Sequence, residues 1–383
     1  MQNPGTNQSG MRQGNERLVL TLLRRHGPLP KAEIARMTGL SAQTVSVIMR
    51  ALEDEGLLAR GAPQRGRVGQ PSVPMALAAE GAFFLGLKIG RRSSEMVLVD
   101  FLGRIRDRRI RRHDWPTPEA ALDFADSAAR ELTETLPPAL RPRIAGMGVA
   151  LPFRLWDWPD SLGAPTRTME AWRDCDLRAA LAARHGIEVF LENDATAACG
   201  AELVFGTTPL PADFLHAYVG FFVGGGMVLE SRLFPGRRSN AGALGSLPVR
   251  GADGGTVQLL DRASSARLEA ALLAEGLPTH RLWSTAEAWD IPERLLTPWI
   301  EDAAEGLAQA AVTALALLDI EAMVIDGWMP GAIRQRLVAA TDRAFRRQDR
   351  AGLEPLRLIE GSLGPDARPL GAAALPLAAR YLT

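Results

Sequence analysis

Three short amphipathic segments separated by glycine turns occupy the first 60 residues, and this order leaves few folds open. In 17–25, apolar residues share one helical face and arginines lie opposite. Gly27-Pro28 ends that helix, and a second short helix is expected over 30–37. A tight turn at 38–40 leads to a third helix over 41–54. Two short helices joined by a glycine turn are typical of the helix-turn-helix unit.

The third helix of this unit carries the residues that would read DNA. Its inward stripe is Val45, Ile48 and Leu52 at spacings of three and four. Ser41 is placed to cap it, and the N-terminal part would lie in the major groove. A glutamine pairs with adenine through two hydrogen bonds, a threonine touches a thymine methyl group, and an arginine two turns on meets phosphate. The DNA contacts predicted on this helix are Ser41, Gln43, Thr44, Ser46 and Arg50.

A basic hairpin is expected after the third helix. Segments 57–60 and 72–77 can form strands, and 61–70 is a turn rich in glycine and arginine. Flanking glycines let the backbone approach a duplex, so Arg65, Arg67 and Gln70 are predicted to contact phosphate or the minor groove. Gln43→Ala should relax sequence preference, whereas Arg67→Ala should weaken binding to all sequences. The alternative is a winged helix that binds another protein.

Composition supports a small basic module on a neutral body. The 383 residues contain 44 basic and 44 acidic side chains and are 46% hydrophobic, as in ordinary globular proteins. Residues 11–75 alone hold ten basic and five acidic residues, one footprint of a DNA-binding domain. Two cysteines cannot build a disulfide scaffold or a four-thiolate zinc site.

No membrane or secretion signal is evident in the sequence. No apolar run reaches about 18 residues, so no membrane-spanning helix is expected. The polar segment 1–14 lacks the apolar centre of a signal peptide and is predicted to be a disordered tail. We therefore expect a cytoplasmic protein with reduced thiols and no membrane partner.

The rest of the chain alternates strands and helices, which indicates an α/β class with layered sheets. A hairpin is predicted over 214–233, with its turn at Gly224-Gly225-Gly226. The other strands are expected at 83–89, 95–99, 104–111, 144–151, 187–191 and 322–326, and the helices at 118–136, within 172–185, at 195–205 and at 302–318.

Several segments behind the winged helix resemble one family. Glu192-Asn193-Asp194-Ala195 is similar to the signature of the ROK family of repressors, open reading frames and sugar kinases. Met147 to Pro152 resembles that family's Gly-x-x-x-Pro-Gly strand end, and Asn240 to Gly245 its Ala-Gly-Glu-Ile-Gly-His segment. The resemblance spans about residues 15–383. It implies an N-terminal winged helix-turn-helix followed by a two-lobed, actin-like sugar-kinase body with a ligand cleft between the lobes.

The resemblance also implies domain boundaries. The expected parts are a tail at 1–14, a DNA-binding domain at 15–78, a first lobe at 82–195 completed by a C-terminal helix at 370–383, and a second lobe at 196–369.

Departures from the family pattern argue against kinase activity. Family kinases carry Asp-x-Gly-Gly-Thr in the first hairpin, and the segment here is Lys88-Ile89-Gly90-Arg91-Arg92. A cation at Lys88, where a magnesium-supporting acid belongs, opposes phosphoryl transfer. Arg91 and Arg92 would suit an anion, but a solvated hairpin tip is the favoured interpretation. Trp328 would crowd the adenosine side, and no cofactor is expected.

The family's zinc site is also missing. Segment 251–258 has no cysteine where the family has Cys-x-Cys-Gly-x-x-Gly-Cys, and Ser246 replaces the expected histidine. Zinc needs about four N, S or O ligands, so we expect no metal. Ala243 replaces a sugar-binding glutamate, which removes a second ligand contact besides the one lost at Ser246.

What remains of the cleft still suggests a ligand site. The predicted ligand contacts are Pro152, Phe153, Trp156, Trp158, Arg167, Asn193, Asp194 and Ser246. Asp194 matches the catalytic base of the kinases; without a metal-bound acceptor it would accept a hydrogen bond from a ligand, or cap the helix that follows. Tryptophan faces stack on sugar rings, although core packing is favoured for Trp172. Arg167 would select an anionic ligand or lie free on the surface.

Taken together, the residues and the resemblance predict a transcriptional regulator without kinase activity. Repression is the favoured mode, with a sugar or sugar-like effector in the cleft and a homodimer or tetramer on a near-palindromic double-stranded DNA operator. Two alternatives stay open. One is a ROK sugar kinase with a DNA-binding appendage, and the other is a DNA-binding protein that needs no ligand.

Overall fold

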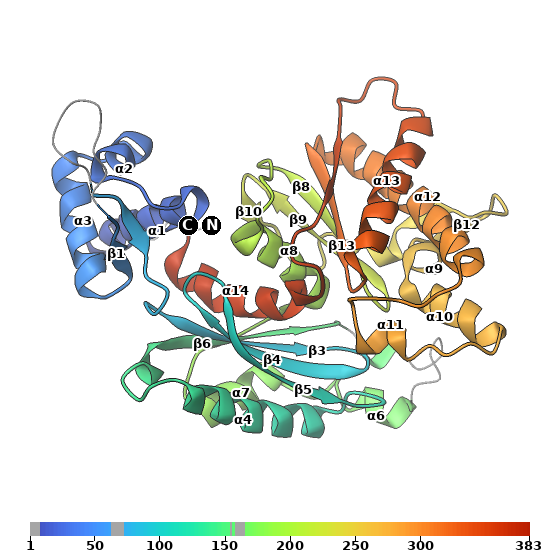
Figure 1. Cartoon of the computed structure of the whole chain (residues 1–383), viewed down its shortest axis with the longest axis horizontal. Coiled ribbons are helices and arrows are strands. Elements are labelled where there is room, and N and C mark those ends of the chain that lie inside the picture. Colours follow the sequence, from blue (N-terminus) through green and yellow to red (C-terminus); the bar gives the residue numbers. More distant parts are fainter. Residues whose placement is uncertain (1–7, 63–72, 154, 158–164) are drawn as a thin grey trace.

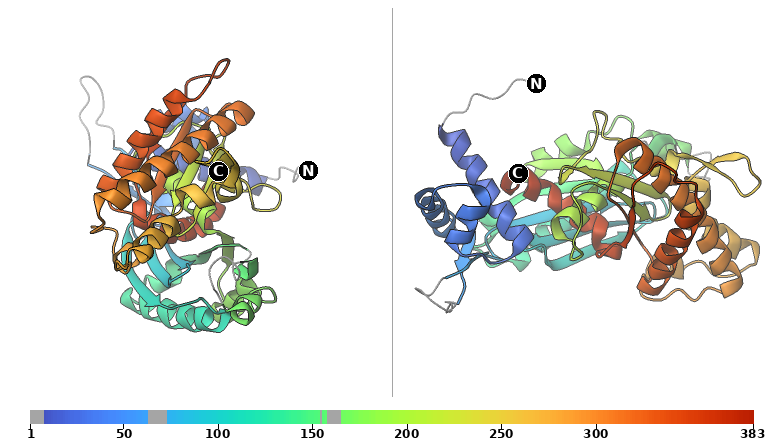
Figure 2. Two further views of the ribbon diagram at one scale, coloured as in Figure 1. Left: turned by 90° about the vertical axis from the view of Figure 1, so that its right-hand side faces the viewer. Right: turned by 90° about the horizontal axis from the view of Figure 1, so that it is seen from above.

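A small head of helices with a two-stranded sheet lies at one end of a two-lobed body (Figure 1). The computed structural model describes residues 8–62, 73–153, 155–157 and 165–383. Turning the molecule shows the head projecting from the body at the end where the C-terminus lies (Figure 2). No helix in these ranges combines the length and apolarity needed to cross a lipid bilayer.

The head contains three helices and a two-stranded antiparallel sheet. These are α1 (Gln8–His26), α2 (Lys31–Thr38), α3 (Ala42–Asp54), β1 (Leu58–Arg60) and β2 (Met75–Leu77). Gly39 ends α2 with a φ of 71°, the left-handed conformation that lets the chain turn sharply into α3.

Helix α1 begins earlier than the sequence suggested. The tail predicted over 1–14 is wrong for residues 8–14, which form the first two turns of α1. An i,i+4 ion pair of 2.8 Å between Arg12 and Glu16 supports these polar turns, whose lack of apolar periodicity hid them in the sequence.

The first lobe is built on a five-stranded sheet in the order β5-β4-β3-β6-β7. Its strands are β3 (Phe83–Ile89), β4 (Ser93–Asp100), β5 (Ile105–Arg112), β6 (Ile144–Leu151) and β7 (Val189–Asn193). Helices α4 (Pro118–Thr135) and α7 (Leu177–His185) cover one face, and α14 (Ala367–Tyr381) covers the other (Figure 1). A Cβ at Gly86 or Gly148 would collide with the backbone of α14, so these glycines let the helix lie directly on the strands.

The second lobe has a five-stranded sheet in the order β10-β9-β8-β13-β14. Its strands are β8 (Phe214–Val219), β9 (Val223–Leu229), β10 (Arg232–Leu233), β13 (Ala322–Gly327) and β14 (Arg357–Glu360). Helix α8 (Asp194–Phe205) covers one face, while α12 (Glu293–Leu318) and α13 (Gly331–Arg347) cover the other. The other elements in the described ranges are α6 (Thr166–Glu170), β11 (Pro248–Arg250), β12 (Thr256–Gln258), α9 (Leu260–Ala263), α10 (Ser265–Ala274), α11 (Arg281–Ser284), and 3-10 turns at Arg141–Arg143, Leu155–Asp157, Leu244–Ser246 and Gly364–Asp366.

The turn of the β8–β9 hairpin is not where the sequence placed it. The chain turns at residues 220–222, and Gly224, Gly225 and Gly226 lie inside β9. A Cβ at Gly224 would press on Ala195, and one at Gly226 would press on Cys199. Gly224 and Gly226 therefore serve close packing against α8 and not a change of direction.

Helices α8 and α14 lie side by side between the two sheets. A Cβ at Gly371 of α14 would collide with the carbonyl of Ala197 in α8, so the two backbones touch. Helix α14 ends against α1 of the head (Figure 1), and Phe205 at the end of α8 has the Arg24 guanidinium of α1 5.6 Å from its ring centre. The two helices therefore connect the two sheets with the head.

Candidate functional site

Helix α3 presents a polar surface from a firmly capped start. The Ser41 hydroxyl accepts a hydrogen bond from the Thr44 amide at 3.1 Å, and the two hydroxyls lie 2.8 Å apart. Both predicted DNA contacts are therefore also part of the cap that fixes the beginning of the helix. The opposite face is buried in the head core, as predicted for Val45, Ile48 and Leu52.

The outward face of α3 contains one residue that the sequence analysis missed. Gln43, Val47 and Arg50 are exposed and follow i, i+4, i+7, while Ser46 is half-buried beside them. Val47 is 58% exposed, unusual for a branched aliphatic side chain. Its spacing from Gln43 was the signal available in the sequence, because position 47 falls outside the inward stripe. Arg65, Arg67 and Gln70 lie outside the described residues.

A cavity of about 270 Å³ lies between the lobes. That is near the lower end of cavities that hold small ligands, roughly 300–1,000 Å³. Five predicted ligand contacts line it: Pro152, Phe153, Asn193, Asp194 and Ser246. Further lining residues come from β3 and the loop after it, from the hairpin turn at 220–222, and from the start of α14.

Two predicted ligand contacts lie elsewhere. Trp156 packs against the first-lobe core, with the Arg173 guanidinium 5.3 Å from its ring centre. Arg167 is exposed on α6, and neither residue is among the described lining of the cavity. Trp172 is buried and donates from Nε1 to the Pro116 carbonyl at 2.9 Å, as expected for core packing. Trp158 lies outside the described residues.

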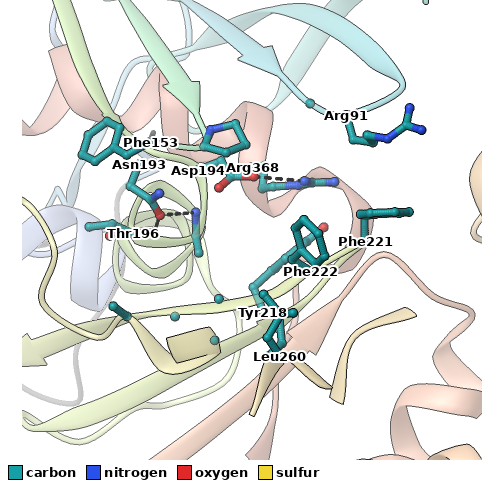
Figure 3. A pocket seen from close by; sticks show the side chains of 18 of the residues that line it. Arg91, Phe153, Asn193, Asp194, Thr196, Tyr218, Phe221, Phe222, Leu260 and Arg368 are labelled. Atoms are coloured by element: carbon teal, nitrogen blue, oxygen red, sulfur yellow. Dashed lines mark hydrogen bonds and ion pairs between the residues drawn. The ribbon is translucent and has the colours of Figure 1, made fainter. Parts of the chain in front are cut away.

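Asn193 and Asp194 make contacts that the sequence analysis did not predict. Asn193 is the cap of α8, since its Oδ1 accepts from the amides of Ala195 at 3.0 Å and Thr196 at 3.3 Å. The capping role considered for Asp194 is therefore wrong, because the helix begins at Asp194 itself. Instead, the Asp194 carboxylate accepts a hydrogen bond at 3.1 Å from Arg368 in the first turn of α14 (Figure 3).

Arg368 is the main site residue that the sequence analysis missed. It is 174 positions from Asp194, and only the return of α14 to the first lobe brings the two together. Each side chain of the pair is about 15% exposed or less. The guanidinium also lies 5.0 Å from the ring centre of Tyr218, so it joins residues of both lobes at one point.

The cavity wall carries further cations. Lys88 is buried, and its ammonium donates to the Ser93 hydroxyl at 2.9 Å. Burial, and to a lesser extent the nearby Arg368, lower the pKa of Lys88 to about 8. No ion pair joins Lys88 or Arg91 to a carboxylate within the described ranges.

Arg91 and Arg92 do not form a solvated hairpin tip, which corrects the favoured interpretation. Arg91 stacks 3.6 Å from the ring centre of Trp115 and donates to the Asp114 carbonyl at 2.6 Å. Burial lowers the pKa of Arg91 to about 10. Arg92 donates at 2.7 Å to Glu269 on the second lobe. Aromatic and acidic partners that follow far along the chain hold both arginines at the cavity.

Aromatic side chains line the cavity beside these cations. Phe221 and Phe222 lie in the hairpin turn that the sequence misplaced, with their rings at 4.9 Å in an edge-to-face arrangement (Figure 3). Trp328 also lines the cavity, and its Nε1 donates to the Leu282 carbonyl at 2.9 Å. The Arg91 guanidinium lies 5.5 Å from the ring centre of Phe221, so the cavity offers cations and apolar ring faces next to each other.

The segment expected to lack zinc ligands forms an ordered hairpin. β11 and β12 pair across 248–258, and the Asp253 carboxylate closes the turn by accepting from the Gly255 amide at 2.9 Å. A carboxylate that accepts from the backbone takes the place of thiolates in shaping this loop.

Comparison with known proteins gives the relationships of both parts. Residues 84–379 match the model described as ROK family, and residues 12–59 match one described as winged helix-turn-helix DNA-binding. A crystal structure described as a ROK family transcriptional regulator, homolog of E. coli MLC protein, aligns with a TM-score of 0.69 and 21% identity over 97% of each chain.

Two relatives among curated proteins extend the comparison. The chain is 27% identical over 372 residues to the uncharacterized protein y4fQ of Sinorhizobium fredii, covering 96% of this chain and 92% of that one. It is 22% identical over 242 residues to the xylose repressor of Bacillus subtilis. That second alignment covers 63% of this chain and 62% of the repressor.

Proposed function

Because the chain belongs to the ROK family and carries a winged helix-turn-helix ahead of the ROK body, we propose that it is a transcriptional repressor that senses an anionic sugar derivative in the interlobe cleft. The observation that carries the effector class is the set of cations at the cavity. Lys88 and Arg91 have no carboxylate partner in the described ranges, and Arg368 has only Asp194.

The chemistry of the wall supports a ligand with one charged end and one ring face. A carboxylate or phosphate oxygen gains strong charge-assisted hydrogen bonds from ammonium and guanidinium groups. The apolar face of a sugar ring packs on aromatic rings such as Phe221 and Phe222. A neutral hexose would leave Lys88 and Arg91 facing the ligand without an anionic partner, so we expect it to bind more weakly.

Phosphoryl transfer is not proposed for this cleft. A catalytic carboxylate must be free to take a proton from the attacking hydroxyl, and Asp194 is held by Arg368. Lys88 lies where kinases of the family have an acid, and a buried cation there repels the divalent ion that phosphoryl transfer requires.

The two helices between the sheets offer a route from the cleft to the head. At the cleft, the Asp194–Arg368 ion pair joins the first turns of α8 and α14. At the far end, Arg24 of α1 donates to the Phe101 carbonyl, and its guanidinium lies 5.6 Å from the ring centre of Phe205, the last residue of α8.

Helix α14 reaches the head by its own contacts. The Thr383 amide donates to the Thr21 hydroxyl of α1 at 3.1 Å. Tyr381 packs edge-to-face at 5.0 Å on Phe101 of the first lobe, whose carbonyl accepts from Arg24 of α1. The head core and the α14 face of the first-lobe sheet form one continuous apolar cluster. An anion that competes with Asp194 for Arg368 would alter the pairing of the two helices at the end opposite the head.

The effector shifts DNA binding only as far as it binds the two states differently. We propose that the anion favours the state that releases DNA. In a homodimer, two heads would read half-sites a helical turn or a multiple apart, so the operator is expected to be near-palindromic.

A ligand screen tests the effector class. Thermal unfolding of the full chain is followed with hexose 6-phosphates, hexuronates and aldonates, each beside its neutral parent sugar. The charged members are expected to raise the Tm, because a ligand that binds only the folded state stabilises it. An equal or larger Tm rise with the neutral sugars contradicts the proposal.

A turnover assay tests the absence of kinase activity. No ADP release is expected with magnesium, ATP and the same sugars. Magnesium-dependent turnover that disappears in Asp194→Ala would replace this proposal with a kinase carrying a DNA-binding domain.

A further inference from the structure

A second cluster of polar side chains lies inside the second lobe, away from the cleft lining. Glu202 is in the last turn of α8, His216 is in the middle of β8, and Asp326 is near the end of β13. One ligand atom from each lies within 4.8 Å of the others. All three are buried, with 1%, 0% and 0% exposure respectively.

The topology brings these residues to one place. Strands β8 and β13 are parallel neighbours in which His216 pairs with Val324, so Asp326 lies two residues further along the same face. Helix α8 covers this face and contributes Glu202. The cluster therefore ties a helix to two adjacent strands.

His216 has no hydrogen-bond partner on either ring nitrogen within the described ranges of the chain. An imidazole must donate from at least one nitrogen, and a buried donor without a partner costs roughly 1–3 kcal/mol. The Glu202 Oε2 atom also has no hydrogen-bond partner within the described ranges. The Oε1 atom of the same carboxyl accepts from the Ser362 amide at 3.0 Å and from the Ser362 hydroxyl at 2.7 Å. Two of the three side chains, those of His216 and Glu202, thus have ligand atoms without a hydrogen-bond partner at the same buried point.

The surrounding charges favour a cation. Asp326 is fixed by the amides of Gly327 and Gly364, each at 2.8 Å, and by Arg334 at 3.2 Å. Arg334 is shared with Glu360 at 2.9 Å. One guanidinium therefore pairs with two carboxylates, those of Asp326 and Glu360. The Glu202 carboxyl lies within 4.8 Å of Asp326 and has no cationic partner of its own in the described ranges, and a divalent cation would balance it.

We propose that Glu202, His216 and Asp326 bind a divalent transition-metal ion. One imidazole nitrogen and two carboxylate oxygens form a donor set that zinc and manganese accept. Ligand atoms around a four-coordinate ion lie about 3.3 Å apart, given bonds of about 2.0–2.2 Å, so a small inward movement of the three side chains closes the site. The site differs from the family's cysteine-rich zinc segment, whose place here is taken by the β11–β12 hairpin.

The role that follows is structural. The ion would hold α8 on its sheet and, through Ser362 and Gly364, would fix the loop that leads into α14. Sequence spacing could not reveal it, because the three residues come from 202, 216 and 326 and are brought together only by the fold.

Metal content and metal-dependent stability test the proposal. Untagged full chain is analysed by ICP mass spectrometry after dialysis, then stripped with chelator and titrated with ZnCl₂ or MnCl₂ while the Tm is followed. We expect close to one equivalent of metal per chain and a Tm rise of about 3 °C at a hundredfold excess over the Kd.

Two variants and one matched control identify the ligands. Glu202→Gln keeps the shape and removes the charge, and His216→Phe replaces the imidazole with an apolar ring suited to a buried position. Both are expected to lose stoichiometric binding and the Tm response. His185→Asn removes another histidine that contacts a carboxylate, Asp126 at 3.1 Å, and should behave like the wild type.

Two outcomes would overturn the proposal. One is less than about 0.1 equivalent of metal with no Tm response of the wild type to either ion. The other is equal binding by the wild type and all three variants, which would mean adventitious surface binding. In the first case, His216→Phe should also be more stable than the wild type, since it would remove an unsatisfied buried imidazole.

Discussion

Replacing Lys88 with methionine should make the protein more stable and less able to sense its effector. Lys88 is 5% exposed, and burial lowers the pKa of its ammonium from 10.5 to about 8. This shift means that folding at neutral pH carries the cost of burying a charge. At about 1.4 kcal/mol per pH unit of difference, the cost is about 3 kcal/mol.

The sign of the pH dependence follows from proton binding. Between about pH 8 and 10.5 the unfolded chain keeps the Lys88 proton while the folded chain releases it. The unfolded state therefore binds more protons, and the contribution of Lys88 makes stability rise with pH across this window. Below pH 8 both states are protonated and the full cost is present.

The groups that face Lys88 do not remove this cost. Ser93 accepts a hydrogen bond from the ammonium, and Glu95 and Asp194 attract it, whereas Arg368 repels it. Methionine keeps most of the apolar stem and removes the charge. Lys88→Met is thus expected to be about 3 kcal/mol more stable than the wild type at pH 7, with the gap closing towards pH 10.5.

Urea unfolding of both proteins at pH 7, 8, 9 and 10 measures the gap. Other groups that titrate at high pH, such as Cys199 with its raised pKa, are common to both proteins and cancel in the difference. Lys31→Met is the matched control, since Lys31 is the only other lysine and is exposed, and it should show no such gap. A less stable Lys88→Met at pH 7, or a gap that stays constant with pH, refutes the reasoning.

Three further predictions address the helix pair and the reading head. Asp194→Asn leaves Arg368 buried without its counter-ion and should lower the free energy of unfolding by about 3–5 kcal/mol. In the double variant with Arg368→Met, the loss should be smaller than the sum of the two single losses, and chemical denaturation of all four proteins would show this. Additive costs would mean that the pair does not interact. Arg24→Met should bind the operator like the wild type when no effector is present. In a gel-shift titration, the change in operator Kd that the effector causes should be at least threefold smaller than in the wild type. An unchanged response would exclude α8 and α1 as the connection between cleft and head. Gln43→Ala should lose about 1–3 kcal/mol of discrimination at one base pair, whereas Arg50→Ala should weaken all duplexes alike, which binding-site selection would distinguish.

The parts of the structure that depend on local pattern could be predicted from the sequence. The head helices follow apolar spacing, and Ser41 caps α3 as its residue type predicts. Strand β3 is a continuous apolar run buried along its length, interrupted only by Gly86 and Lys88.

Features that depend on contacts between distant segments could not be predicted. Arg368 reaches Asp194 only because α14 returns to the first lobe, and Arg92 is held by Glu269 across the cleft. The triple glycine in β9 is identical in sequence to a turn, and only packing on α8 shows that it is not one. Trp156 was predicted at the cleft because tryptophan commonly binds sugar rings, but in the structure it packs against the first-lobe core.

The account rests on the claim that an anion in the cleft changes how the head binds DNA. The most direct measurement is the Kd of the full chain for a duplex from its own upstream region, followed by fluorescence anisotropy at fixed salt. It is made with and without a saturating anionic sugar derivative that raises the Tm. We predict at least a tenfold weaker Kd with the ligand for the wild type and no change for Lys88→Met. An operator Kd that stays the same while the ligand is bound would contradict the account.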